Sequence, residues 1–276
     1  MVSLQKIAVS GIFVLWSSFA GSISPGRPVA GAGDAGMSFA GMMKPGVWSS
    51  FQNQALLPLL DRAAFAFSFE NRFGLKELTS RSVCLTIPSG HAAAGMFYSR
   101  YGSPDFRRET TGLAAGVMLG PNLSAGVETD LFIAHSAGDY RDYYLISFQG
   151  GLLFSIRKNV SAAIHIFNPI PNIIRKSALP SAISAGAGIR INSDLFAGLV
   201  AEMITGSEIC LRTGFEYTAG KKFKIRGGYS SSGPSFSLGA GWSAGPALLD
   251  IAFVTHPQLG ITPSLSVSFL LANRKN

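Results

Sequence analysis

The residues best suited to acid–base or metal chemistry are four histidines, His91, His135, His165 and His256. Their positions do not follow the close spacing of metal ligands, such as His-x-x-x-His. Ser161 precedes His165 by four residues on one face of a predicted strand, which would suit a Ser/His lipid hydrolase. In the membrane β-barrel that is argued below, this face of the strand lines the pore and points away from lipid. We therefore interpret the histidines as turn, loop and wall residues, and predict no enzyme activity, no metal site and no cofactor.

Two cysteines are the other candidates for covalent chemistry. Cys84 and Cys210 fall on the second and tenth predicted strands, and both point inward. In a ring of about 14 strands these two strands lie on well-separated walls, whereas a disulfide needs a Cα separation below about 7 Å. We predict two free thiols in the lumen, although the compartment argued below permits disulfides.

The composition indicates a membrane protein. Of the 276 residues, 47% are hydrophobic and only 14% are charged, against about 25% charged residues in a typical soluble domain. The same values exclude intrinsic disorder. The net charge is +8, and basic pairs such as Arg157-Lys158 and Lys221-Lys222 fall in predicted turns. These pairs suit a solvated turn, an anionic lipid headgroup or an acidic partner.

The N-terminus has the pattern of a secretory signal peptide. Lys6 precedes an apolar run from Ile7 to Trp16, and the small residue Ala20 follows. We expect residues 1–20 to be removed, with an uncleaved anchor as the alternative. No later apolar run reaches the roughly 20 residues of a spanning helix. The remaining way to cross a membrane is a β-barrel, which places the protein in the bacterial outer membrane and excludes nucleic acid as a partner.

Alternating side chains support this interpretation. Phe65, Phe67 and Phe69 are separated by small or charged residues, and the same alternation runs through residues 208–218. The polar positions are mostly Gly, Ser and Ala, whereas the outer face of a soluble sandwich would carry Lys, Glu and Thr. We predict an all-β fold, a transmembrane antiparallel β-barrel of about 14 strands within residues 63–276.

The connections between these strands give the orientation. Every second connection is short and mostly rich in turn formers, as in Gly120-Pro121-Asn122. The intervening connections include the two longest, Ile133 to Tyr143 and Asn168 to Ser181. Outer-membrane barrels have short periplasmic turns and longer external loops. We therefore predict that both termini lie in the periplasm.

Residues 21–62 lack strand alternation and are rich in Gly and Ala, which suits a plug packed in the lumen. The segment Gly31-Ala32-Gly33-Asp34-Ala35-Gly36 is followed by Asn53-Gln54-Ala55-Leu56-Leu57. Both resemble motifs of the FadL-like outer-membrane proteins, particularly the PorV/PorQ branch, in which a G-x-G-x-A segment precedes Asn-Pro-Ala-x-Leu; Gln54 replaces the usual Pro. The resemblance implies a 14-stranded barrel with an N-terminal plug or hatch. It marks as plug residues Gly31, Gly33, Asp34, Gly36, Asn53, Ala55 and Leu57.

Strand parity predicts two further groups of residues. Charged side chains of inward parity should form a lumenal network that anchors the plug or lines a polar path: Glu202, Glu208, Arg212, Glu216, Lys224 and Arg226. Small side chains of outward parity would let another membrane protein approach the wall, although ordinary lipid contact also explains them: Ala197, Ala201, Thr213, Gly227 and Ala240.

Three functions are open at this point. Family members divide between uptake of hydrophobic molecules and service in outer-membrane secretion or assembly machinery. Because several predicted outer loops are only about 3 to 6 residues long, we favour a structural subunit of such a machine. The alternatives are a channel for hydrophobic small molecules and a lipid-modifying enzyme. The expected partners are outer-membrane lipids and other outer-membrane or periplasmic proteins, with a hydrophobic ligand or lipopolysaccharide as further candidates.

Overall fold

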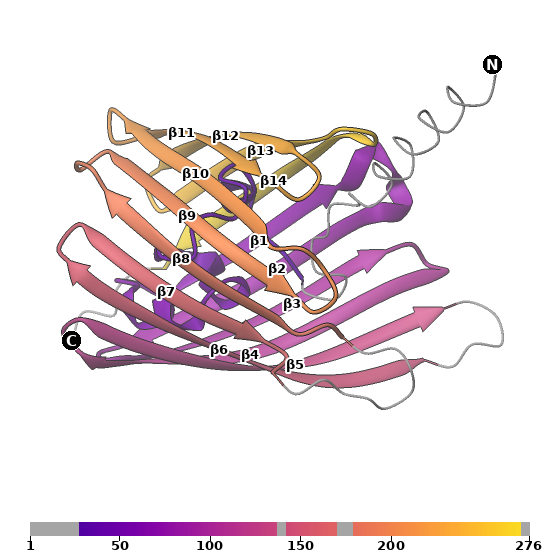
Figure 1. The fold of residues 1–276 in the computed structure, drawn as a ribbon, viewed down its shortest axis with the longest axis horizontal. Coiled ribbons are helices and arrows are strands. Elements are labelled where there is room, and N and C mark those ends of the chain that lie inside the picture. Colours follow the sequence, from indigo (N-terminus) through magenta and orange to yellow (C-terminus); the bar gives the residue numbers. More distant parts are fainter. Residues whose placement is uncertain (1–27, 137–141, 170–178, 272–276) are drawn as a thin grey trace, which may run out of the picture.

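The fold is a closed antiparallel β-barrel, seen in a computed structural model that describes residues 28–136, 142–169 and 179–271 (Figure 1). Each strand pairs with the next along the chain, and β1 pairs with β14, so the ring has no free edge. The predicted fold class and strand number are confirmed. The fourteen strands are β1 (Ala64–Asn71), β2 (Thr79–Ser89), β3 (Ala92–Gly102), β4 (Phe106–Gly120), β5 (Leu123–Ser136), β6 (Tyr143–Arg157), β7 (Val160–Phe167), β8 (Ala182–Arg190), β9 (Leu195–Ile204), β10 (Cys210–Ala219), β11 (Phe223–Ser230), β12 (Ser235–Ala244), β13 (Ala247–His256) and β14 (Gly260–Leu270).

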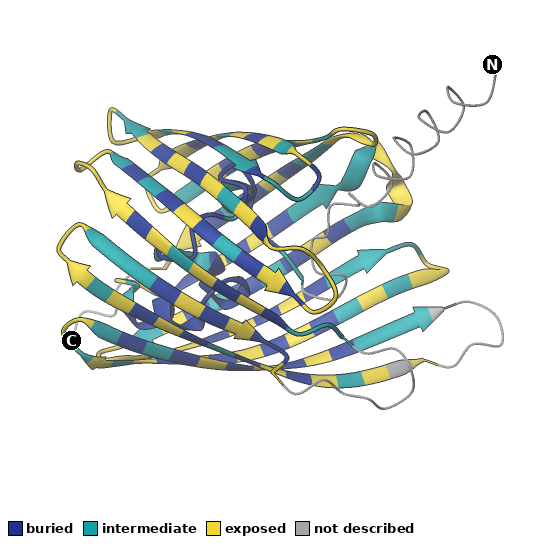
Figure 2. Ribbon diagram, in the orientation of Figure 1, coloured by how far each residue is buried: buried dark blue, intermediate teal, exposed yellow. Residues whose placement is uncertain are grey.

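Side chains alternate between an apolar outer face and a small or polar inner face, as the banding along the strands in Figure 2 shows. In β1, Phe65 and Phe67 are exposed, while Ala66 and Ser68 are buried in the lumen. The outer face is the belt of large hydrophobic side chains that a barrel presents to lipid. Within the described ranges, the helices are all too short or too polar to cross a membrane.

The barrel has two different ends. At the end where β1 begins, the described connections are tight, such as Gly90-His91 between β2 and β3 and Lys158-Asn159 between β6 and β7. We call this the turn end. The opposite end, which we call the loop end, carries η3 (Arg72–Gly74) and η4 (Lys76–Leu78) between β1 and β2. The predicted signal peptide and the middle of both long loops lie outside the described residues.

The described part of the predicted plug, residues 28–62, lies inside the barrel (Figure 1). It contains one short α-helix and two 3-10 helices, α2 (Ala32–Ala35), η1 (Val47–Phe51) and η2 (Gln54–Leu59). α2 packs mainly against β12, β13 and β14, η1 against β1, β2 and β3, and η2 mainly against β4, β5 and β6. Trp48 and Phe51 of η1 join Phe97 of β3 in one apolar cluster, and Leu56 of η2 packs with Leu153 of β6 in another.

Glycines in the wall let the plug backbone come close. A Cβ on Gly126 would lie 2.3 Å from the carbonyl carbon of Gln54, and one on Gly198 would lie 2.2 Å from the carbonyl oxygen of Ala40. Both distances are far below van der Waals contact, so no larger residue fits there without movement. In the described ranges, six wall glycines face plug backbone atoms in this way: Gly116, Gly126, Gly198, Gly214, Gly228 and Gly239. The high glycine content therefore serves the fit between wall and plug.

One difference between a predicted and an observed strand boundary affects the predicted site residues. The tenth strand was expected to begin at Glu208, but β10 begins at Cys210. Glu208 and Ile209 lie in the turn from β9, and both are exposed. Cys210 is the first residue of β10 that pairs with β9, where it lies opposite Glu202. The alternation of polar and apolar residues begins two positions earlier, in the turn.

Candidate functional site

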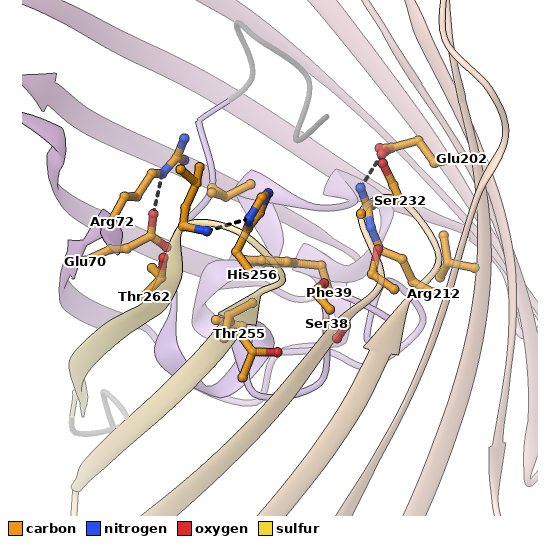
Figure 3. A pocket seen from close by; sticks show the side chains of 18 of the residues that line it. Ser38, Phe39, Glu70, Arg72, Glu202, Arg212, Ser232, Thr255, His256 and Thr262 are labelled. Carbon is orange, nitrogen blue, oxygen red and sulfur yellow. Dashed lines mark hydrogen bonds and ion pairs between the residues drawn. The ribbon is translucent and has the colours of Figure 1, made fainter. Parts of the chain in front are cut away.

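A cavity of about 420 Å³ lies in the lumen between the plug and the loop end of the barrel (Figure 3). Its floor is formed by plug residues that include Ala35, Phe39 and Met42, and its walls include Val200 of β9 and Val254 of β13. Most of the lining is apolar. The volume falls within the range of about 300–1,000 Å³ that is typical of small-molecule sites, so the cavity is the main candidate binding site.

Two ion pairs lie on opposite sides of this cavity (Figure 3). On one side Arg72 Nε donates to Glu70 Oε1 at 2.8 Å, and its guanidinium lies 5.0 Å from the centre of the Tyr101 ring. On the other side Arg212 Nη2 donates to Glu202 Oε2 at 2.5 Å. Because each arginine has a carboxylate partner, the two pairs add polar ends to the cavity without adding net charge.

His256 is part of the cavity wall and has a structural role. Its Nδ1 atom accepts hydrogen bonds from the backbone N–H groups of Gln258 and Leu259, both at 3.2 Å. Its ring and the Phe73 ring form an edge-to-face contact, with their centroids 5.5 Å apart. These hydrogen bonds stabilise the turn between β13 and β14. They also occupy the acceptor nitrogen of the imidazole.

Beneath the cavity, an ionic cluster joins the plug to the wall. Lys44 Nζ of the plug lies 2.5 Å from Glu216 Oε2 of β10. Arg226 of β11 donates to the same Glu216 oxygen at 2.6 Å and to Asp250 Oδ1 of β13 at 2.7 Å. Lys224 Nζ is 3.8 Å from Glu216 Oε1. Arg226 is only 3% exposed, so the carboxylates on both sides are needed to offset its loss of hydration.

Asp34 adds a buried acid to this cluster from the plug side. Burial raises the pKa of its carboxyl, while the charge of Lys44, a hydrogen bond with Gln52 and the charge of Arg226 act in the opposite direction. A Cβ on the neighbouring Gly33 would lie 3.0 Å from Arg226 Cζ. The glycine thus leaves room for the guanidinium to lie against the plug.

The predicted lumenal network is divided in the structure. Glu216, Lys224 and Arg226 come together, whereas Glu202 and Arg212 form a separate pair in the cavity wall. Glu208 lies outside the lumen, in the exposed β9–β10 turn, and its assignment to the network is wrong.

Two members of the ionic cluster, Lys44 and Asp250, were not predicted from the sequence. Lys44 is a single charge in an otherwise uncharged stretch of the plug, which gives no signal. Asp250 could have been found, because it is the one acidic residue among the apolar neighbours of β13 and has inward parity.

The predicted plug motifs form the contacts that shape the plug. Gly31 has a φ of 94°, and a Cβ there would lie 2.6 Å from Trp48 Cδ1. Asn53 caps η2, since its side-chain oxygen accepts from the N–H of Ala55 at 3.1 Å, and its amide donates to the Met42 carbonyl at 3.3 Å. Asn53, Ala55 and the motif residue Leu57 are fully buried.

The predicted partner-facing wall is partly covered by its own barrel. A Cβ on Gly227 would lie 2.6 Å from Cε1 of Phe215, the outward-facing residue opposite it in β10. Phe215 is also opposite Ala197 in β9. Thr213 and Ala240 are exposed, and Ala201 is half-buried. The small residues at Gly227 and Ala197 therefore lie beside the Phe215 ring, and Gly227 is not open to a partner.

A second acidic group, not predicted as a site, lies on β5 and β6. Gln149 Nε2 of β6 donates to Glu128 Oε1 at 2.7 Å and to Asp130 Oδ2 at 2.5 Å, and all three side chains are buried. Their inward parity was visible in the sequence. Within the described ranges, no group of three His, Cys, Asp or Glu residues is arranged to hold a metal ion.

The covalent candidates lie apart from one another. Ser161 and His165 both face inward on β7, but four residues of strand span about 13 Å, too far for the hydrogen bond of a catalytic pair. Cys84 on β2 and Cys210 on β10 are both buried free thiols. Cys84 Sγ lies 3.4 Å from the carbonyl oxygen of Val47 in the plug, and Cys210 Sγ lies 3.3 Å from Ser230 Oγ.

Comparisons with known proteins bear on the fold. The sequence matches no protein-family profile and no curated protein sequence. The structure is similar to that of a FadL homologue from Pseudomonas aeruginosa, with a TM-score of 0.66 and 12% identity over 89% of this chain and 99% of the other. It is also similar to the Ralstonia pickettii toluene transporter TbuX (TM-score 0.64, 10% identity, 82% and 94% covered) and to the P. putida toluene transporter TodX (0.64, 10%, 83% and 95%). The chain has the fold of the FadL-like barrels and is a protein of the bacterial outer membrane.

Proposed function

We propose that this protein is a channel that carries hydrophobic small molecules across the outer membrane. The observation that carries this proposal is the cavity of about 420 Å³ inside the barrel, with its largely apolar lining. A barrel that passed only hydrophilic solutes would have a polar interior throughout. The proposal agrees with the similarity in fold to two toluene transporters.

The ion pairs at the ends of the cavity define the ligand further. Glu70–Arg72 and Glu202–Arg212 are each internally neutralised, so a charged ligand would have to compete with an existing partner. An uncharged apolar molecule, or one with a single polar group, would fill the cavity without breaking either pair. A ligand that crosses the barrel must also pass the plug, so transport requires movement of residues near the Lys44–Glu216 ion pair.

Uptake by intact cells tests the proposal. Cells that lack their own hydrophobic uptake channels would express the protein and receive radiolabelled toluene, a labelled fatty acid or a labelled sugar. We expect faster uptake of at least one apolar probe and no change for the sugar. The proposal fails if none of the apolar probes enters faster than into cells with an empty vector.

A matched pair of variants links uptake to the cavity. Val254→Trp adds a ring to the cavity wall, whereas Phe253→Trp alters the neighbouring residue, which faces outward. We expect Val254→Trp to reduce uptake and Phe253→Trp to leave it unchanged. Heat-modifiable gel migration would show that both barrels are folded. Equal uptake by the two variants would contradict a route through this cavity.

The hypothesis favoured from the sequence, a structural subunit of a secretion or assembly machine, has less support. It depended on short outer loops and on the small outward-facing residues, of which Gly227 is covered by Phe215. The PorV/PorQ-like motifs around Asn53 remain its main basis. Purification in mild detergent, with identification of co-eluting proteins, would decide in its favour if one outer-membrane or periplasmic protein co-purified in a fixed ratio.

A further inference from the structure

Two arginines face each other on the outside of the barrel, near its loop end. Arg81 of β2 and Arg100 of β3 are direct cross-strand partners. Both have outward parity, because the adjacent Ser80, Ser82 and Ser99 are buried in the lumen. Like charges at directly opposite positions of a sheet destabilise it. An anion between the two guanidinium groups would remove this repulsion.

The surroundings of this pair are cationic and concave. Arg81 and Arg100 line a hollow of about 260 Å³, together with Lys76, Glu77, Thr79, Gly102, Ser103 and Pro104. The hollow therefore holds three cations and one carboxylate, with two hydroxyl groups at its edge. Within the described ranges, no carboxylate lies within 4.0 Å of the charged nitrogens of Lys76, Arg81 or Arg100. Glu109 is the partner of Arg100 on β4, but its carboxylate pairs with Arg107, and Glu70 likewise pairs with Arg72.

The wall on the membrane side of this hollow is apolar. Along β2 and β3, the next outward pairs toward the turn end are Val83 with Tyr98, Leu85 with Met96, and Ile87 with Ala94. The six residue steps from Arg81 to Ile87 span roughly 20 Å along the strand. The outer surface thus presents a cationic hollow at one level and a continuous hydrocarbon-like surface below it, as an anionic lipid with several acyl chains requires.

We propose that this surface binds lipid A, the phosphorylated and acylated glycolipid of the outer leaflet. Its phosphate groups would contact Lys76, Arg81 and Arg100, and its acyl chains would lie against the three apolar pairs of β2 and β3. Arginine forks match phosphate oxygens in a bidentate way, and the lysine ammonium adds a third charge. The loop end is the end expected to face outward, so its lipid contacts are those of the outer leaflet. The apolar pairs below the hollow place it directly beside the acyl chains of the membrane, so a lipid phosphate is the anion within reach. The proposal is independent of what the lumen carries.

Binding of defined lipids to the purified full-length barrel in detergent tests this directly. Native mass spectrometry would compare bis-phosphorylated lipid A with dephosphorylated lipid A and with phosphatidylglycerol. We expect lipid A to bind at least about tenfold more tightly than its dephosphorylated form, which corresponds to about 1.4 kcal/mol. Equal binding of the two forms would overturn the proposal, as would equal binding of phosphatidylglycerol or displacement of lipid A by millimolar inorganic phosphate.

Paired variants locate the site. The double variant Arg81→Gln/Arg100→Gln removes the facing charges, and Arg157→Gln/Lys158→Gln removes two charges from an exposed connection at the turn end. We expect the first to weaken lipid A binding about tenfold or more and the second to leave it unchanged. Arg81→Lys/Arg100→Lys keeps the charge but not the fork, so its binding should be intermediate. Heat-modifiable migration checks folding. Equal loss in the first two variants, or no loss in the first, would refute the assignment.

Discussion

Gly36 of the plug and Gly239 of β12 lie backbone against backbone. A Cβ on Gly36 would be 2.9 Å from the Cα of Gly239, and a Cβ on Gly239 would be 3.1 Å from the Cα of Gly36. Contacts this short leave no space for even one methyl group on either side. The plug and the wall can approach this closely only because neither residue has a side chain. A substitution as small as alanine therefore tests the contact.

The first prediction concerns Gly36→Ala. The new methyl group must displace backbone in the plug or in β12, and overpacking of this kind costs about 1–3 kcal/mol. We expect a lower unfolding midpoint and a larger or less stable single-channel conductance in planar bilayers. Gly46→Ala is the matched control in the same segment, because Gly46 has extended backbone and nothing within 4 Å of a Cβ. Identical behaviour of both variants would show that the plug does not depend on this contact.

The second prediction concerns the buried guanidinium of Arg226. Arg226→Met leaves Glu216 and Asp250 without their shared partner, and removing one member of a buried ion pair costs about 3–5 kcal/mol. Denaturant unfolding should show this loss. The next residue, Ile225, is exposed on the outer face, so Ile225→Leu should change stability by less than about 1.5 kcal/mol. A similar loss in both variants would mean that the inner and outer faces are wrongly assigned.

The third prediction concerns orientation. Ser207 lies in the exposed turn between β9 and β10 at the loop end, and Ser193 lies in the exposed turn between β8 and β9 at the turn end. A membrane-impermeant maleimide should label Ser207→Cys in intact cells and Ser193→Cys only after the outer membrane is opened. The native thiols are buried and provide the background measurement. Reversed labelling would place the termini outside the cell.

The fourth prediction concerns the outer wall. Gly227→Leu must push the Phe215 ring away from β11, so we expect a loss of roughly 1 kcal/mol in unfolding free energy. Ala240→Leu adds an apolar side chain at an exposed position and should leave stability unchanged. Thermal unfolding followed by gel migration would compare them. If Gly227→Leu were as stable as the wild type, the Phe215 ring would not be restrained by this contact.

Much of the fold was predictable because a membrane barrel leaves a two-residue period in the sequence. The period gave the strand number and most of the strand limits, since lipid on one side and the lumen on the other select opposite side chains. It failed at Glu208, because alternation can continue into a turn after strand pairing has ended. The end of pairing depends on the register with β9, which a single strand does not contain.

The site was less predictable for a different reason. Parity shows that Arg226 and Glu216 point inward, but it does not say what meets them in the lumen. Their partner Lys44 comes from a segment without periodic structure, and its position is set by contacts with many strands at once. The cavity is likewise a space between plug and wall. Its lining combines residues from both ends of the sequence, such as Phe39 and Val254.

The contact between Ala32 of the plug and Ser266 of β14 also limits when the protein can fold. The Ala32 N–H donates to Ser266 Oγ at 3.0 Å, and the two residues are 234 positions apart. Contacts between such distant residues slow folding and leave apolar strands exposed meanwhile. A chain that has only partly emerged from the inner membrane lacks β14, so it has neither a closed ring nor this anchor for its plug. The polypeptide must therefore be kept from aggregating in the periplasm until its last strand arrives.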